Sequence, residues 1–368
     1  MITLKKITLE ELEEFVFSDF FKKLRNKPIS KPRAISYINN PRANKKDYIV
    51  FMAFKEEELV GYRTILPDHF FIGSQKKSFG WLSGNWVDLN FRRKGISTLL
   101  FNEVLKEWNH RLLFTNFSKA SELLYYKTKQ FDLLKELKGS KYYLRFCLAD
   151  ILPHKKAIFK FTKVFLYLFD VVFNILFDVR FVFLKSSKTN NLIFKKDEVW
   201  NESIYNFTKN DVEDNFFKRG KKEMNWIKNF PWILSTENQK KEFKNYHFSS
   251  YAKEFNFNSY SIYNKENVLI GLLLITIKNK HMKIPYIYFN DENVREIANF
   301  ISSHSIKYNI KTLELYNESL EKELNTILSF LSRKDFTQKY FITKNLKNSV
   351  KGLKNIKIQS GDGDSVFT

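Results

Sequence analysis

The stretch that decides the fold of this chain is Trp86-Val87-Asp88-Leu89-Asn90-Phe91-Arg92-Arg93-Lys94-Gly95-Ile96-Ser97-Thr98-Leu99-Leu100. An apolar, strand-like run over residues 79–89 leads into a short basic turn, and an amphipathic helix follows directly. Backbone N–H groups at a helix N-terminus point at an anion, and the helix dipole favours its charge. The turn is therefore expected to hold a pyrophosphate, with Gly95 allowing close backbone approach and Arg92, Arg93 and Lys94 adding positive charge.

The elements around this turn predict a mixed α/β domain. Thr8 is expected to cap the first helix, with Glu11 as its capping-box partner. Trp81 and Trp86 lie five residues apart on one strand and are expected to face opposite sides of it. We expect strands at residues 48–54, 59–66, 79–89, 112–117 and 142–148, and helices at 9–24, 28–41, 96–108 and 120–129.

Residues 151–185 differ in character from the preceding sequence. Polar positions recur every three or four residues and form one narrow helical stripe: Lys156, Lys160, Lys163, Tyr167, Asp170, Asn174 and Asp178. A helix that is apolar around most of its girth is buried or meets lipid. Its charges interrupt every window of about 20 residues, which argues against a membrane span. Two interpretations stay open: a helix packed between domains, and a helix that contacts a membrane surface through residues 156–180.

Residues 200–345 resemble the first part of the chain in outline and predict a degenerate internal repeat. The segment 268–271 echoes 58–61, since both read as a turn that enters a strand and reaches a glycine. The strand expected at 284–289 runs into Asn290-Asp291-Glu292-Asn293, which would repel a phosphate, so this half is not expected to bind the same cofactor. We predict domains at 1–150 and 200–346, an apolar linker helix within 151–199, and a tail at 347–368.

The composition limits the class of protein. The chain is 43% hydrophobic and 17% aromatic, which excludes a disordered protein. Its net charge of +22 is compatible with a polyanionic partner, but acidic residues are interspersed throughout, so a lysine-rich genome explains it as well and nucleic acid is not the expected partner. The single cysteine, Cys147, and the lack of a signal-peptide pattern favour the cytoplasm. The six histidines form no ligand cluster, so no metal is expected.

Two motifs together resemble a known family. Arg92-x-x-Gly95-x-Ser97, between a strand and a helix, resembles the acetyl-CoA-binding motif of the GNAT N-acetyltransferases, with Ser97 where the family has Gly or Ala. Residues 120–131 resemble the second family motif, with its tyrosine at Tyr126 and Gln130 in place of the usual glycine. Asn116 ends the strand between the two motifs. The resemblance implies a tandem of acyl-CoA N-acyltransferase-like domains joined by the apolar helix, with the C-terminal half degenerate.

The resemblance also implies roles for individual residues. The backbone at Val87 and Leu89 would bind the pantetheine as an added strand, and an N–H near Val87 would polarise the thioester carbonyl. Tyr126 would donate a hydrogen bond to the departing sulfur, so that Tyr126→Phe lowers the rate about 10- to 100-fold without abolishing it. The pyrophosphate would be held by Arg92, Arg93, Lys94, Gly95, Ile96, Ser97 and Thr98, and Asn116 would complete the cofactor site.

The general base is less clear from the sequence. Many members of the family use a glutamate on the strand before the phosphate turn, but residues 79–88 contain no glutamate. Asp88 is the only carboxylate there, and it reads equally as a solvated residue at a strand end. We therefore expect either Asp88 or a chain of water molecules to take the proton.

The function expected from these observations is transfer of an acetyl group from acetyl-CoA to a primary amine of a small polar acceptor, an amino sugar or an amino-acid-like molecule. Two alternatives stay open. A tandem enzyme of the peptidoglycan-bridge type would use aminoacyl-tRNA, which suits the positive charge but needs no CoA turn. A non-catalytic protein would bind CoA without turnover.

Overall fold

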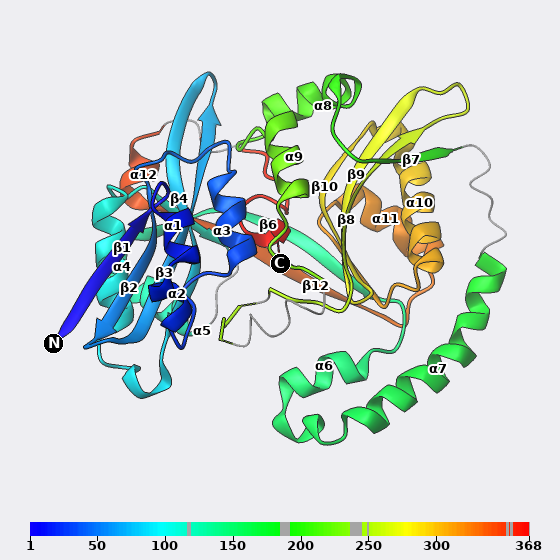
Figure 1. Cartoon of the computed structure of the whole chain (residues 1–368). Helices are drawn as coiled ribbons and strands as arrows, with labels where there is room; N and C mark the ends of the chain where they lie inside the picture. The colour runs from blue at the N-terminus through cyan, green and yellow to red at the C-terminus, as the bar shows by residue number, and fades with distance from the viewer. Residues whose placement is uncertain are drawn as a thin grey trace. The chain divides into compact units, whose positions relative to one another are not determined.

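The computed structural model describes residues 1–115, 119–184, 192–235, 245–248, 250–350, 353 and 356–367 (Figure 1). Two compact units form. Unit 1 comprises Met1–Glu136, Val199–Phe255 and Gln338–Thr368, and unit 2 comprises Leu137–Glu198 and Asn256–Thr337. Each unit draws on separate parts of the chain, so the two units do not correspond one to one with the segments 1–150, 151–199, 200–346 and 347–368.

The sheet of unit 1 is an antiparallel meander followed by a parallel strand. β3 pairs with both β2 and β4 in antiparallel fashion, and β4 then pairs with β5 in parallel. The end of β12 lies antiparallel to β5, with Tyr340 opposite Thr115. The strands are β1 (Ile2–Thr8), β2 (Tyr48–Lys55), β3 (Glu58–Ile72), β4 (Gln75–Val87), β5 (Leu112–Thr115) and β12 (Ser332–Thr343).

Helices cover both faces of this sheet. Ile96, at the start of α4, packs against Gly61 of β3, whereas Arg33 of α3 donates a hydrogen bond to Thr64 on the opposite side of the same strand. α9 joins α3 through Trp226, whose indole donates to the carbonyl of Ser36. The helices of unit 1 are α1 (Leu12–Phe17), α2 (Asp19–Lys23), α3 (Lys31–Ile38), α4 (Ile96–Glu107), α5 (Lys119–Thr128), α8 (Glu202–Asp214), α9 (Lys221–Asn229) and α12 (Lys344–Asn348).

Several predicted elements differ from the structure. The helix expected at 9–24 is broken at Ser18, whose hydroxyl accepts the N–H of Phe21 and starts a separate helix. Thr8 ends a strand that the sequence analysis missed, although its N–H and hydroxyl do donate to Glu11. The strand expected at 142–148 lies earlier, as β6 (Phe131–Tyr143), and Leu148 begins α6 (Leu148–Lys155).

The prediction that Trp81 and Trp86 face opposite sides of their strand is wrong. Trp81 pairs with Leu66 and Trp86 with Tyr62. Leu66 and Tyr62 lie four residues apart on β3, so both tryptophans share one face. The cause is a β-bulge: Thr64 pairs with Gly84 and Ile65 with Leu82, which leaves Ser83 as an extra residue.

Unit 2 repeats the strand plan of unit 1. β10 pairs antiparallel with β9 and parallel with β11, and the end of β6 lies antiparallel to β11. Its strands besides β6 are β7 (Ile193–Asp197), β8 (Phe255–Tyr263), β9 (Leu269–Lys278), β10 (His281–Phe289) and β11 (Thr312–Leu315). Its helices are α6, α7 (Lys163–Leu184), α10 (Val294–Lys307) and α11 (Glu318–Ile327).

A matching pair of glycines explains the sequence echo between 58–61 and 268–271. A Cβ on Gly61 would lie 2.8 Å from Ile96 of α4, and a Cβ on Gly271 would lie 2.5 Å from Ile297 of α10. Gly61 pairs with Val87, the last residue of β4, and Gly271 with Phe289, the last residue of β10. In both units, a glycine lets the helix after the strand pack closely on the sheet.

The apolar segment forms helix α7, which runs beside α6 in Figure 1. Residues 157–160 form a short 3-10 turn before it. Among the described residues, no helix is long and apolar enough to cross a membrane.

Candidate functional site

β4 and β5 diverge in unit 1. They pair at Gly80↔Leu112 and Trp81↔Leu113, the two pairs found between these strands in the described residues. β5 continues to Thr115 and β4 to Val87. Parallel strands that separate in this way expose backbone N–H and C=O groups along the opening, and an extended ligand can bind them as an added strand.

The turn after β4 has the backbone that the sequence predicts for an anion site. Arg93 and Gly95 adopt left-handed conformations, with φ of 63° and 78°. Gly95 is the N-cap of α4 and provides no capping side chain, so the first N–H groups of the helix are available to a ligand. A Cβ at Gly95 would meet no atom within 4 Å, so the turn faces open space. These features suit a phosphate group.

The side chains of the turn divide between packing and exposure. Ile96 is buried, whereas Leu89 is 73% exposed. Ser97 contacts the amide of Asn85 on β4 at 3.3 Å, which fixes the turn to the strand. Lys94 lies 5.0 Å from the ring of Phe91. The remaining predicted cofactor residues Arg92, Arg93 and Thr98 are exposed, and Val87 is half-buried against the core.

Asp88 has a structural task. Its side chain accepts the N–H of Asn90 at 2.9 Å and so caps the short 3-10 turn Leu89–Phe91. Its own N–H donates to the carbonyl of Val60 at 2.9 Å. Both contacts hold the turn against β3.

The two adjacent tyrosines of α5 differ in environment. Tyr126 is 64% exposed, whereas Tyr125 is buried against Phe101 and Phe114. The Tyr125 hydroxyl accepts a hydrogen bond from Arg63 at 3.2 Å. Asn116 lies outside the described residues.

Arg63 was not predicted from the sequence, although it stands alone among apolar neighbours on β3. Its side chain is fully buried, opposite Asn85 in the β3–β4 ladder. Within the described part of the chain, its Nε and Nη2 have no hydrogen-bond partner. A buried guanidinium with free donors is costly unless a ligand or water accepts from it.

A buried polar cluster lies on the other face of β3 and β4. The Arg33 guanidinium donates to Tyr37 at 2.7 Å, to Thr64 at 2.9 Å and to Tyr246 at 3.0 Å. Burial raises the pKa of Tyr37 and of Tyr246, and the nearby Arg33 opposes that rise. Both hydroxyls therefore stay protonated at neutral pH and can donate hydrogen bonds.

The segment 356–367 brings a carboxylate to this cluster. Ser83, the bulged residue of β4, donates to Asp364 at 2.6 Å. A Cβ on the neighbouring Gly363, whose φ is +99°, would lie 3.4 Å from Thr115 and 3.6 Å from Trp81. Asp364 therefore lies where β4 and β5 begin to diverge. The sequence predicts a tail at 347–368, and an acidic stretch in a basic chain is the signal that sets its end apart.

Two contacts hold this segment in place. Phe367 is buried and stacks on Trp232, with ring centroids 4.4 Å apart and planes 5° from parallel. Asp362 accepts from Arg219 at 3.1 Å. Burial raises the pKa of Asp362, with Arg219 opposing the rise.

Arg219 also belongs to a buried ionic network centred on Asp68. Arg42 contacts Asp68 at 3.1 Å, Arg219 donates to it at 2.9 Å, and the Trp81 indole donates at 2.7 Å. Burial raises the pKa of Asp68, but the two guanidinium groups outweigh it and bring the pKa to about 2. This network fixes Trp81 of β4 beneath the opening.

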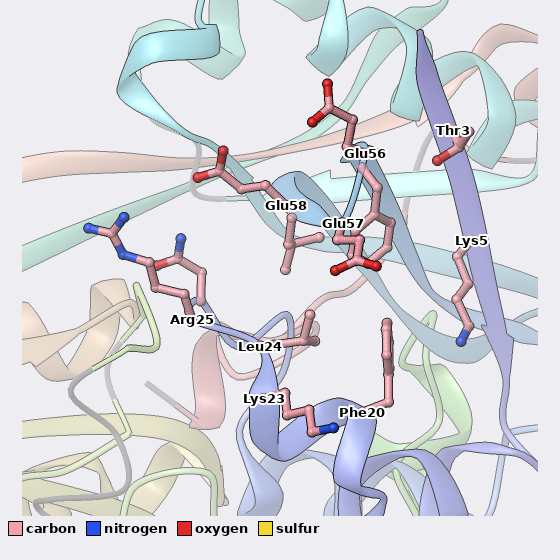
Figure 2. A pocket seen from close by; sticks show the side chains of 12 residues that line it. Thr3, Lys5, Phe20, Lys23, Leu24, Arg25, Glu56, Glu57 and Glu58 are labelled. Carbon is pink, nitrogen blue, oxygen red and sulfur yellow. The ribbon is translucent and has the colours of Figure 1, made fainter.

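Two surface hollows lie on the side of α2 and α3. Figure 2 shows the larger one, of about 630 Å³, where Lys5, Lys23 and Arg25 surround the acidic turn 56–58. The smaller one, of about 200 Å³, is lined in part by Tyr246, which bonds Arg33. In the described residues, no three His, Cys, Asp or Glu side chains gather as a metal-ligand set.

Comparisons with known proteins agree with this geometry. The family model for GNAT acetyltransferases matches residues 9–125. A crystal structure of an Enterococcus faecalis V583 protein of unknown function, described as a probable N-acyltransferase, aligns with a TM-score of 0.51 and 12% identity over 94% of this chain and 73% of the other. Saccharomyces cerevisiae N-myristoyltransferase with bound myristoyl-CoA aligns with a TM-score of 0.51 and 11% identity, over 93% and 82%.

At these identities the structural likeness concerns the fold alone. No curated protein has significant sequence similarity to the chain. The family match spans β2 to β5 and includes the turn after β4 with its left-handed Gly95. Residues 9–125 therefore match the GNAT acetyltransferase family, and the chain has a mixed α/β fold similar to that of acyl-CoA N-acyltransferases.

Proposed function

We propose that this protein transfers an acetyl group from acetyl-CoA to a primary amine of a small polar acceptor. The observation that carries the proposal is the opening between β4 and β5, which leads into the left-handed turn at Arg93 and Gly95. An extended pantetheine fits the opening, and a pyrophosphate fits the turn. In the reaction, the amine nitrogen attacks the thioester carbonyl, the C–S bond breaks, and CoA leaves as a thiolate.

In this proposal, backbone groups more than side chains bind the acyl donor, acetyl-CoA. Val87 and Leu89 would bind pantetheine, and an N–H near Val87 would stabilise the developing oxyanion. The N–H groups of residues 92–98 would hold the pyrophosphate, with the exposed Arg92, Arg93 and Lys94 supplying charge. Asn116 keeps the cofactor role that the family resemblance implies.

Asp364 is the better candidate for the general base, in place of Asp88. Asp88 is engaged as a cap for the turn. The carboxylate of Asp364 is fixed by Ser83 on β4, at the point where a thioester in the opening would meet an amine from the α3 face. A base at this position would take the proton that the ammonium must lose before it attacks.

Tyr126 keeps its proposed role as hydrogen-bond donor to the leaving sulfur. A tyrosine with a pKa near 10 and a thiol near 8.5 make full proton transfer to the thiolate uphill by about 2 kcal/mol. Donation of a hydrogen bond suffices for so good a leaving group. Its exposed position on α5 is compatible with contact to a ligand that binds from solvent.

The charges that line the larger hollow support a small charged acceptor. Carboxylates at 56–58 attract an ammonium group, and Lys5, Lys23 and Arg25 attract an anionic one. This mixture favours an amino-acid-like acceptor over an uncharged one. A long acyl donor is a second candidate, because a yeast protein of this fold binds myristoyl-CoA.

Calorimetric titration with acetyl-CoA and with myristoyl-CoA tests the proposal. We expect acetyl-CoA to bind, and Gly95→Glu to weaken binding about 100-fold, because the variant strains a left-handed residue and places a carboxylate at the pyrophosphate. Asn293→Glu, in the equivalent turn of unit 2, is the matched control and should bind normally. No binding of either thioester to the wild-type chain would refute the proposal. Tight binding of myristoyl-CoA alone would replace acetyl by a long acyl group.

A further inference from the structure

Helix α7 turns the acidic and amide residues of its polar stripe toward the rest of unit 2. Asp170 is 4% exposed and accepts the N–H groups of Leu148 and Ala149, each at 2.9 Å, which caps α6. Asn174 accepts the N–H of Phe146 at 2.8 Å and donates to its carbonyl at 2.9 Å. The acidic and amide groups of the helix are therefore used up inside unit 2.

Asp178, near the C-terminal end of α7, is also bonded to unit 2. Asp178 accepts from Arg145 at 2.8 Å. Between these polar contacts, Phe173 and Phe177 pack against Phe146, with ring centroids 5.5 Å and 5.4 Å away. These contacts lie along one side of α7, and the buried Phe181 and the hydrogen bond from Arg180 to the carbonyl of Leu144 add to them near its C-terminal end.

The remaining girth of α7 is apolar and exposed. Phe165 is 73% exposed and Ile175 is 68% exposed. The exposed side chains span the helix, with Val164, Leu168, Val172 and Val179 among them. An ordinary surface helix has the opposite arrangement, with its apolar stripe inward and its charges in water. An apolar face of this length marks an interaction surface.

The charges that border this face are basic. Lys155, Lys156, Lys160 and Lys163 are exposed at the N-terminal end of α7 and in the turn before it. Of the two carboxylates of the segment, Asp170 is buried, and Asp178 is half-buried and paired with Arg145. The exposed surface over residues 155–182 is therefore apolar with a cationic end.

We propose that α7 docks on an anionic lipid surface, with its apolar face in the boundary between headgroups and acyl chains and its lysines on the headgroups. At 1.5 Å per residue the helix is about 33 Å long and would lie in the plane of the surface. Clustered lysines beside an apolar helix are attracted to acidic lipids in a salt-dependent way.

A second copy of the chain fits this face less well. Of the two carboxylates in residues 155–182, Asp170 is 4% exposed and Asp178 is paired with Arg145, so little negative charge faces the lysines of a partner. An anionic membrane supplies both the apolar medium and the negative charge. Docking concerns α7 of unit 2 and does not depend on the reaction proposed for unit 1.

Vesicle co-sedimentation of the full chain tests the proposal. The probes are vesicles of phosphatidylcholine alone and of phosphatidylcholine with about one third phosphatidylglycerol. We expect binding to the acidic vesicles that weakens as salt rises, and at least tenfold weaker binding to the neutral ones. Phe165→Glu with Ile175→Glu should abolish binding, and Lys156→Glu with Lys160→Glu should remove the preference for acidic lipid.

Val268→Glu is the matched control, because Val268 is a 55% exposed apolar residue in the turn between β8 and β9. It should bind vesicles as the wild-type chain does. Circular dichroism of each variant verifies folding, and Val172→Glu with Val179→Glu provides a second pair should the first misfold. Absence of binding to acidic vesicles overturns the proposal. If the wild-type chain then forms a stable dimer, and Phe165→Glu with Ile175→Glu dissociates it, the apolar face of α7 binds a second copy of the chain and not lipid.

Discussion

The turn after β4 and the turn after β10 occupy the same place in their units and differ in sequence and backbone conformation. Each follows the last strand of a meander and precedes a helix that packs on a glycine, Gly61 or Gly271. The first turn has left-handed residues at Arg93 and Gly95 and a basic sequence. The second forms a 3-10 turn over Asp291–Asn293 and has none of the positive-φ residues found in the described chain.

This difference separates two requirements: close packing of the helix on the sheet, and a left-handed turn before that helix. The glycine beneath the helix serves packing, and both units retain it because the fold needs the close approach. The left-handed turn is proposed to bind the anion, and unit 2 lacks it without loss of the fold. A site of this kind therefore depends on the turn, whereas the architecture depends on the strand and helix around it.

The strands themselves differ in a second way. Both β4 and β10 have an irregular register before their ends. In β4 the extra residue is Ser83, which holds the carboxylate of Asp364. In β10 the irregularity falls at Ile284 and Pro285, which are apolar. The comparison therefore supports the proposal that both the donor site and the base lie in unit 1.

The largest effect is expected from Asp364→Asn. Removal of the base should lower kcat for acetyl transfer about 100- to 10,000-fold and leave KM for acetyl-CoA within about twofold, because Asp364 is assigned to the acceptor. Steady-state thiol release measures both. Asp364→Glu should recover part of kcat, which a purely structural role would not explain. An Asp364→Asn enzyme with normal kcat would refute the assignment.

The second largest effect is expected from Asp68→Asn, on the stability of the fold. It leaves Arg42 and Arg219 without their shared carboxylate and should cost about 3 kcal/mol of unfolding free energy at neutral pH. With its pKa lowered from 3.8 to about 2, Asp68 stabilises the fold above pH 4 and loses that contribution as pH falls through 2. The difference is about 2 kcal/mol. Urea unfolding of both proteins between pH 2 and 7 measures it.

Asp150 of unit 2 offers a control for the Asp68→Asn experiment. The pKa of Asp150 is also lowered to about 2, by hydrogen bonds from His281 and Lys311, but its side chain is 34% exposed. Solvent screening should make Asp150→Asn much less costly than Asp68→Asn. Equal losses from the two substitutions would contradict the view that burial gives the Asp68 network its strength.

The two glycines give the next test. Gly61→Ala should destabilise by about 1–3 kcal/mol, because its Cβ would meet the stiff Cγ2 of Ile96 at 2.8 Å and the carbonyl of Trp86 at 3.3 Å. Gly271→Ala should cost less, because the Cδ1 of Ile297 can rotate away. Denaturation midpoints give the two costs. Gly61→Ala should also weaken acetyl-CoA binding by displacing α4, and an equal effect of Gly271→Ala on binding would break the comparison.

The sequence predicted the local backbone around the candidate site. It indicated a strand, a basic turn with Gly95 and a helix, and the structure has these elements with Gly95 left-handed, while anion binding by the turn stays a prediction. The bulge at Ser83 escaped prediction because an extra residue in a strand is set by its cross-strand partners. Asp364 could not be predicted because it lies 281 positions after Ser83 in the chain. The strand β1 was not predicted because the adjacent Lys5 and Lys6 interrupt its alternation of apolar and polar residues.

The smallest effect is expected from a charge reversal in the turn after β10, which should not create a second acetyl-CoA site. Asp291→Lys with Glu292→Lys gives the second turn a basic sequence like that of the first, but leaves it a 3-10 turn without left-handed residues. Because oriented N–H groups, more than charge, hold a phosphate at a helix N-terminus, calorimetry with acetyl-CoA should still give one site per chain and an unchanged affinity. A stoichiometry of two would show that charge alone separates the two turns, and the argument from backbone conformation would then fail.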